Sequence, residues 1–226
     1  MSNYFIRTIM TLALLLGGLA AQAQDEKPVP YQEGLHYFLI EGAPVQASAN
    51  AEIEVAEAFS YLCSHCSTFE PYIEAWKKRK PENVVFRRIP VVFGRDSWEL
   101  YARGYVTAEM LNVGDEAHSA MMDRLWKEKK IMRSMDELAD FYSQFGVDRE
   151  KFLAAAGSFA VDSKIKRDQL KLQSYGITGT PSLIVNGKYR VTGSAAVPSF
   201  DVMLDVVNYL AEQERAVSQQ TSAAAD

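Results

Sequence analysis

Two cysteines separated by two residues are the part of this sequence best suited to redox chemistry. Cys63 and Cys66 are the only cysteines of the chain, and they stand in the motif Cys63-Ser64-His65-Cys66. A disulfide between them would close so short a loop that it would add little to stability. The pair is instead suited to exchange its bond with other thiols, because a thiolate both attacks and leaves in that reaction.

The position of Cys63 in the sequence explains why it could be reactive. It follows a predicted strand and begins a predicted helix, where free N–H groups and the positive end of the helix dipole favour a thiolate. Cys66 lies nearly one turn deeper and is expected to be less exposed. We therefore predict that Cys63 forms the mixed disulfide with a substrate and that Cys66 resolves it.

His65 lies between the two cysteines and could donate a hydrogen bond to the sulfur, so we predict an electrostatic role for it. Two thiolates and a histidine could also hold a soft metal, which leaves a copper carrier as an alternative. A structural zinc site needs four ligands, and His36 and His118 are far away in sequence. We expect no metal and no other cofactor, with the disulfide itself as the redox group.

Glu57 falls on the apolar face of a predicted strand. Alternation with period two places it on the side of Ile53, Val55 and Phe59. A carboxylate in such a place is costly unless it keeps its proton, so we predict a raised pKa. Six residues before Cys63, it could lie beneath the cysteine pair and exchange a proton with Cys66. The alternative is an exposed strand edge.

A threonine and a proline precede a later strand. Thr180-Pro181 follows Gly179, and proline is not expected inside a central strand of a sheet. A cis bond here would turn the chain sharply and leave the backbone of Thr180 free to pair with an extended substrate. We therefore predict that Thr180 and Pro181 bind substrate, whereas the sequence does not reveal the isomer.

The elements that would position these residues form an α/β pattern interrupted by helices. Strand-like segments at 36–40, 53–59 and 84–92 surround a helical segment after Cys63, as in a parallel crossover unit. Two more strands flank Asn186-Gly187, a strong hairpin signal, and an amphipathic helix follows. We expect one α/β domain in two parts, 24–96 and 176–216. An all-helical insertion at 97–175 separates them, and a disordered tail follows at 217–226.

The first 23 residues have the features of a cleaved signal peptide. Arg7 precedes an apolar run that is too short to span a membrane, and Ala21-Gln22-Ala23 supplies a cleavage site. Removing Arg7 changes the net charge from −5 to −6, and no block of like charge indicates nucleic acid as a partner. We expect an exported protein for which a monomer is sufficient.

Together these features resemble the thioredoxin superfamily, and within it the DsbA family of bacterial periplasmic thiol:disulfide interchange proteins. The likeness to thioredoxin rests on the cysteine motif at a helix start, on Pro71 eight positions after Cys63 and on Thr180-Pro181 before a hairpin. The likeness to the DsbA family adds the helical insertion, Glu57, Phe69-Glu70 and the segment 185–189. It covers essentially all of 24–226.

This resemblance implies an α/β, thioredoxin-like fold with an inserted all-helical domain. It also implies a periplasmic enzyme that donates its disulfide to reduced exported polypeptides, with a very acidic thiol, and a DsbB-like quinone-linked membrane protein that reoxidises it. Glu57, Glu70 and Arg88 would be buried charges that tune proton transfer, with Arg88 where we expect a lysine. Ser64 stands where the family usually has proline; serine caps helices well and adds an N–H near the sulfur.

The reaction predicted from these residues is dithiol–disulfide exchange in the oxidising direction. A disulfide reductase or isomerase is the nearest alternative, although dedicated isomerases of this kind add a dimerisation domain. About thirty residues between the predicted cleavage site and Ile53 are fewer than the roughly 50 of a folded domain. A peptide-binding chaperone and a copper carrier remain as alternatives of a different class.

Overall fold

The structure of the chain is a computed structural model that describes residues 30–42 and 52–223. The predicted signal peptide at 1–23 lies outside the described residues. Within them, no helix combines the length and apolar character that crossing a membrane requires.

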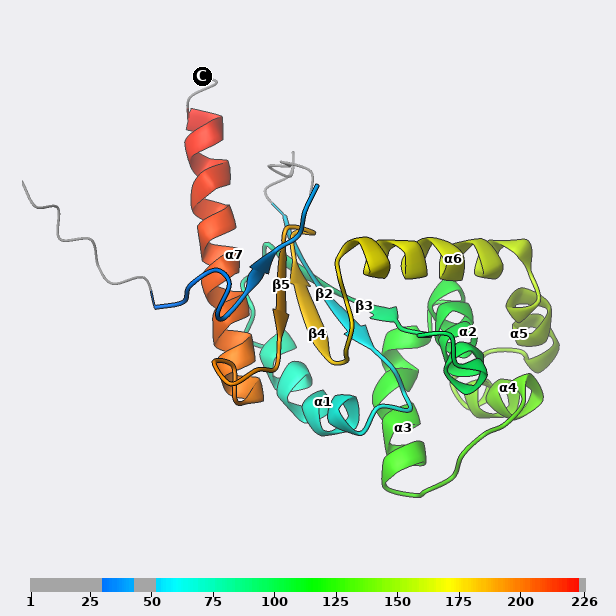
Figure 1. The fold of residues 1–226 in the computed structure, drawn as a ribbon. Helices are drawn as coiled ribbons and strands as arrows, with labels where there is room; N and C mark the ends of the chain where they lie inside the picture. Colours follow the sequence, from blue (N-terminus) through cyan, green and yellow to red (C-terminus); the bar gives the residue numbers. More distant parts are fainter. Residues whose placement is uncertain (1–29, 43–51, 224–226) are drawn as a thin grey trace, which may run out of the picture. The chain divides into compact units, whose positions relative to one another are not determined.

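Five strands form one mixed sheet, in the order β1-β5-β4-β2-β3 (Figure 1). The strands are β1 (Phe38–Leu39), β2 (Ile53–Phe59), β3 (Val84–Pro90), β4 (Ser182–Val185) and β5 (Tyr189–Thr192). The pair β2 and β3 is parallel and is joined through helix α1 (Ser64–Lys77), whereas β2, β4, β5 and β1 pair antiparallel. The predicted strands are therefore present, although the first is shorter than the segment 36–40.

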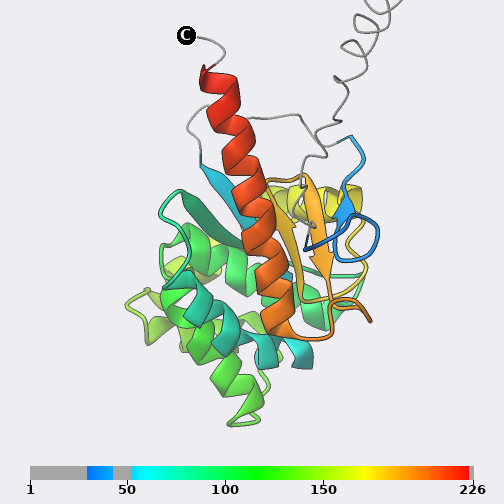
Figure 2. The ribbon, with the colours of Figure 1, turned by 90° about the vertical axis from the view of Figure 1, so that its left-hand side faces the viewer.

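Helices cover both faces of the sheet, and β2 is therefore buried on both sides. On one face Phe69 and Ile73 of α1 and Leu204 of helix α7 (Phe200–Ala223) form one apolar cluster with Val55. Figure 2 looks onto this face, with α7 lying across the strands. On the other face the small side chains of β2, such as Ala56, pack with residues at the end of α6 (Phe159–Ser174).

The segment between β3 and β4 is helical, as predicted. Its helices are α2 (Asp96–Met110), α3 (Gly114–Trp126), α4 (Met135–Ser143), α5 (Arg149–Ala156) and α6. They gather on the β3 side of the sheet in Figure 1. A thioredoxin-like α/β fold with a helical insertion is thus confirmed.

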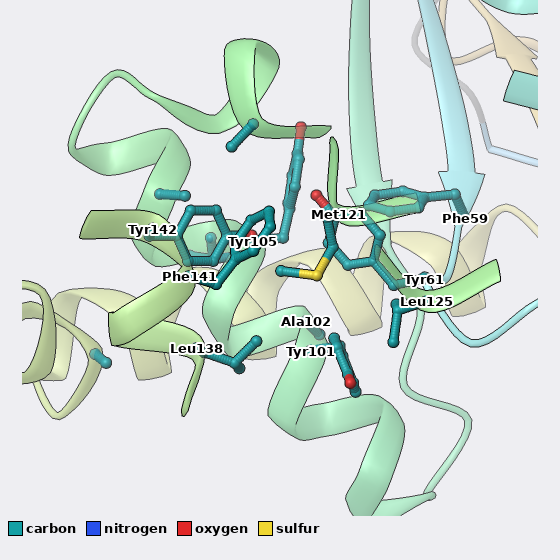
Figure 3. Packing of buried hydrophobic residues seen from close by; sticks show 14 of the residues in the cluster. Phe59, Tyr61, Tyr101, Ala102, Tyr105, Met121, Leu125, Leu138, Phe141 and Tyr142 are labelled. Atoms are coloured by element: carbon teal, nitrogen blue, oxygen red, sulfur yellow. The ribbon is translucent and has the colours of Figure 1, made fainter. Parts of the chain in front are cut away.

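The insertion and the sheet share one apolar core at their junction. Phe59 and Tyr61, at the end of β2, pack with Tyr105 and Met121 of the insertion, as Figure 3 shows. Both cysteines belong to the same cluster. Residues from Tyr31 onward accordingly form a single compact unit. The cysteine pair therefore lies where the two parts of the fold meet.

The C-terminal segment departs from the predicted disordered tail at 217–226. Helix α7 continues to Ala223, and the last three residues lie outside the described residues. The segment after Val217 contains no glycine or proline to end the helix, and its alanine and glutamine residues favour helix. The hydroxyl of Ser218 also donates to the carbonyl of Glu214 at 2.9 Å, which is compatible with helix.

Candidate active site

Cys63 occupies the N-cap position of α1, directly after the loop that follows β2. Its backbone is extended, with φ −95° and ψ 117°, and its N–H donates to the carbonyl of Ser60 at 3.1 Å. Its Sγ accepts the backbone N–H of Cys66 at 3.4 Å. A sulfur in this position receives the free N–H groups of the first helical turn, which stabilise a negative charge.

The two sulfurs differ in exposure and acidity. Both are free thiols in this structure; Cys63 is 9% exposed and Cys66 0%. A hydrogen bond from the Cys66 thiol, helped by Thr180 and by backbone N–H groups, outweighs burial and lowers the pKa of Cys63 to about 5. Burial, the hydrogen bond to Cys63 and the charge of Glu57 raise the pKa of Cys66 well above its usual range. Near neutral pH the dithiol therefore holds a thiolate on Cys63 and a proton on Cys66.

Ser64 and His65 are the exposed residues between the cysteines. Ser64 is the first residue of α1 rather than its cap, because the Cys63 sulfur takes the capping position. The expectation that serine caps this helix is wrong for that reason. The backbone N–H of His65 contributes to the lowered pKa of Cys63. An electrostatic role for its imidazole stays a prediction. As to metal binding, the described residues contain no cluster of three potential metal ligands.

The Thr180–Pro181 peptide bond is cis and faces the cysteine pair. Strand β4 begins at Ser182, which lies opposite Ala58 of β2, so the antiparallel pairing brings the preceding loop to the end of β2. The carbonyl oxygen of Thr180 lies 3.4 Å from Cys63 Sγ. Residues 117 positions apart in the chain thus meet at the sulfur.

A groove lies beside His65 of the cysteine motif, between α1 and the start of α7. It is lined by His65 and Tyr72 of α1, by residues of the segment 193–199 and by Phe200 and Met203 of α7. Its walls combine aromatic and aliphatic side chains with backbone of a loop, which suits an extended peptide. Sequence reasoning did not identify this groove, because its two sides are more than a hundred residues apart.

Glu57 is buried next to an arginine. It is 1% exposed, and it lies opposite Arg88 in the parallel pairing of β2 with β3. Arg88 Nε donates to Glu57 Oε2 at 3.1 Å. Burial outweighs this partner and raises the pKa of Glu57 to about 7, as the sequence predicted. The alternative of an exposed strand edge is wrong, since β4 and β3 flank β2 on both sides.

Arg88 also forms ion pairs with two further carboxylates. Its Nη2 lies 3.2 Å from Glu70 Oε2 and 2.9 Å from Glu74 Oε1, both on α1. Burial would raise the pKa of Glu70, but bonds from His118, Arg88 and Ser119 lower it to about 2. The structure therefore brings together Glu57, Glu70 and Arg88 from three separate elements.

His118 belongs to this buried cluster, and sequence reasoning missed it. It projects from α3 of the insertion, is 1% exposed, and places Nδ1 3.1 Å from the Tyr61 hydroxyl and Nε2 3.2 Å from Glu70 Oε2. The available signal was its place on an apolar stripe, four residues before Met122. Nothing local in the sequence indicated its partners, which lie 57 and 48 residues away.

The raised pKa of Glu57 predicts a pH-dependent effect of Glu57→Gln on stability. A folded pKa of about 7 exceeds an unfolded value of about 4.3, so stability from the protonated form is complete below 4.3 and lost as pH rises through 7. The glutamine variant cannot ionise and should gain up to about 3 kcal/mol over the parent at pH 8.5, with little difference near pH 4. Urea unfolding of both reduced proteins at the two pH values measures this, and equal differences at both would contradict the assignment.

Comparison with known proteins agrees with this geometry. A family model described as a DSBA-like thioredoxin domain matches residues 54–205. The thiol:disulfide interchange protein DsbA of Pseudomonas aeruginosa is 37% identical over 221 residues, covering 97% of this chain and 100% of that protein. The DsbA protein of Azotobacter vinelandii is 37% identical over 93% of this chain and 99% of its own length.

Solved structures give the same result. The crystal structure of Pseudomonas aeruginosa DsbA matches with a TM-score of 0.75 and 34% identity, covering 84% of this chain and 97% of that one. The oxidoreductase DsbA of Xylella fastidiosa matches with a TM-score of 0.75 and 33% identity, covering 83% and 99%. The similarity thus extends over both the sheet and the helical insertion.

Proposed function

This chain belongs to the DSBA-like thioredoxin family and is a protein thiol–disulfide oxidoreductase, and we propose that it donates a Cys63–Cys66 disulfide to reduced exported polypeptides. The observation that supports this direction most strongly is the lowered pKa of Cys63, to about 5. A stabilised thiolate favours the reduced form of the enzyme, and so makes its disulfide a strong oxidant.

Two exchange steps complete the reaction. A substrate thiolate attacks Cys63 Sγ of the oxidised enzyme, the Cys63–Cys66 bond breaks, and Cys66 leaves and takes up a proton. The second substrate thiolate then attacks the substrate sulfur of the mixed disulfide. Cys63 leaves as its stabilised thiolate, and the substrate keeps the new disulfide. Two electrons pass from the substrate to the enzyme, and no cofactor other than the cysteine pair takes part.

The substrate is proposed to lie as an extended segment beside Cys63. The backbone of Thr180 lies beside the sulfur, with Thr180 O 3.4 Å from Sγ, and the cis Pro181 follows it. The groove lined by His65, Tyr72, Phe200 and Met203 would accept apolar side chains of an unfolded polypeptide. Contacts to backbone rather than to particular side chains suit an enzyme that acts on many sequences.

Membership of the family supports a proposal for where this reaction takes place. The periplasm is the proposed location, reached through the signal peptide predicted at 1–23, and the enzyme works as a monomer. A DsbB-like, quinone-linked membrane protein is the proposed reoxidant, since the reduced dithiol must pass its two electrons on to an acceptor before it can react again.

The reduction potential of the cysteine pair distinguishes oxidant from reductase. We expect a value near or above the range of about −180 to −120 mV, because a more stable Cys63 thiolate raises the potential. Equilibration with glutathione buffers, followed by alkylation and separation of the two forms, measures it. A value near the −270 mV or so of thioredoxin would overturn the proposed direction and make the protein a reductase.

A further inference from the structure

The buried cluster around Arg88 contains more acidic groups than basic ones. Glu57, Glu70 and Glu74 all lie within 3.2 Å of its guanidinium group, and Asp115, which is exposed, lies 3.5 Å away. Glu74 is 32% exposed and also pairs with Lys77 at 2.8 Å, which leaves the buried Glu57 and Glu70 to share the Arg88 guanidinium. Two carboxylates that share a buried site do not ionise equally readily, so one of them is the easier to protonate, and which one it is matters for the cysteines.

The insertion places two further polar side chains against Glu70. The Ser119 hydroxyl donates to Glu70 Oε1 at 2.6 Å, and His118 Nε2 lies 3.2 Å from Oε2. The His118–Glu70 contact is close but does not have the geometry of a hydrogen bond. With Nδ1 accepting from the Tyr61 hydroxyl at 3.1 Å, Nε2 carries the imidazole proton and turns its N–H toward the carboxylate. Glu57, in contrast, accepts a side-chain hydrogen bond only from Arg88 Nε among the described residues.

Glu70 therefore has more polar groups beside it than Glu57 has, and this difference leads to a specific assignment. We propose that His118, assisted by Ser119, is a positioning residue that holds Glu70 as a carboxylate and thereby leaves the proton of the cluster on Glu57. The helical insertion would thus decide which carboxyl group of the thioredoxin-like part is the acid. A donor bonded to the charged form of a carboxyl group favours that form, and the neighbouring carboxyl group then becomes the easier one to protonate.

The groups that face His118 are compatible with a neutral donor. Glu70 and Glu74 face it from α1, Arg88 from β3, Tyr61 from the loop before α1 and Tyr105 from α2. Burial and the charge of Arg88 lower the pKa of His118 to about 4, so the imidazole is uncharged near neutral pH. Its action on Glu70 at that pH is therefore that of a nearby N–H dipole rather than that of an ion pair.

The assignment deepens the proposed reaction and rests on it. The protonation state of Glu57 affects the Cys66 thiol, since an ionised Glu57 raises its pKa. Cys66 has to gain a proton when it leaves and lose one when the disulfide forms again. If Glu70 held the proton instead, an ionised Glu57 would remain beside Cys66 and oppose its thiolate. His118 would then influence the reaction without touching the substrate or either sulfur.

Titration of the two carboxyl groups tests this proposal without any turnover. In reduced protein with carbon-13 labelled glutamate, carboxyl signals of Glu57 and Glu70 are assigned with Glu57→Gln and Glu70→Gln and followed against pH. In His118→Leu we expect the midpoint of Glu70 to rise and that of Glu57 to fall, each by about one pH unit or more. His118→Gln, whose amide can donate to Glu70, should return both midpoints toward those of the parent.

Ser119→Ala gives a second test that does not remove a buried ring. It deletes the hydroxyl that donates to Glu70 Oε1 and should shift both midpoints in the same directions as His118→Leu. Ser143→Ala is the matched control, because that exposed hydroxyl donates within its own helix, to the carbonyl of Asp140. Unchanged midpoints in His118→Leu, or in Ser119→Ala if the former does not fold, would overturn the proposal. The proposed direction of disulfide exchange would be unaffected, since the reduction potential tests it separately.

Discussion

Replacing Cys63 with serine is expected to reduce catalysed disulfide formation to the rate of the buffer alone. A serine hydroxyl does not form a disulfide, and the remaining Cys66 is 0% exposed with a raised pKa, so it presents neither an accessible sulfur nor a thiolate. The measurement is oxidative refolding of a reduced, unfolded test protein with known disulfides, followed by recovered activity. Unchanged refolding with Cys63→Ser would remove the basis of the proposed function.

Cys66→Ser is the matched control, because it also abolishes the internal disulfide. It leaves Cys63 at the N-cap of α1 beside Thr180, so a mixed disulfide with glutathione or substrate should form and persist without an internal thiol to resolve it. Mass spectrometry should therefore find the adduct in Cys66→Ser and not in Cys63→Ser. Equal adduct formation in the two variants would contradict the separate roles assigned to the two sulfurs.

Arg88→Met is expected to destabilise the protein by about 3–5 kcal/mol at pH 8, because it leaves buried carboxylates without their cation. The Arg88 side chain is 0% exposed and contacts Glu57, Glu70 and Glu74. Without it the folded pKa values of the buried carboxyl groups should lie above their unfolded values. The variant then has the most stability below about pH 4.3 and loses it as pH rises through the raised values, so the deficit should shrink on acidification.

Arg87→Met on the same strand provides the control for this prediction. Arg87 pairs with Glu54 at 2.6 Å, but both side chains are partly exposed, at 25% and 39%. A pair that water screens is worth about 0–1 kcal/mol, so this variant should differ little from the parent. Urea unfolding at pH 5 and pH 8 measures both variants. Similar losses for Arg87→Met and Arg88→Met, or a deficit of Arg88→Met that does not change with pH, would show that burial of the charge cluster is not the cause.

These predictions assign the helical insertion a chemical role in addition to its packing role. Phe59, Tyr61 and both cysteines share an apolar cluster with the insertion, and the same junction carries His118 and Ser119 to Glu70. Side chains of the insertion therefore contact the polar cluster next to the cysteine pair. A change in α3 can for this reason alter the acidity of groups on β2 and α1.

Several features of the site were determined by the sequence alone, because each depends on neighbours in the chain. Cys63 and Cys66 share one helical turn, so their spacing and the preceding strand were sufficient to predict a sulfur near the free N–H groups of a helix start and a deeper partner. Period-two alternation was sufficient to place Glu57 on a buried face and to predict its raised pKa. Helical periodicity was sufficient to predict the insertion, and resemblance to a family added Glu70 and Arg88 by motif.

The partners of these residues were decided by the tertiary structure. Arg88 meets Glu57 across 31 residues, Ser119 meets Glu70 across 49, and Cys63 meets Thr180 across 117. His118 carried no local signal of its role. On an apolar stripe, a histidine that acts on a buried carboxylate and one that only packs in the core look alike in the sequence. Helix and strand periodicity depend on backbone geometry over a few residues, whereas the sharing of one arginine among several carboxylates depends on how separate elements pack. The place of the proton in this site is therefore a property of the packed fold.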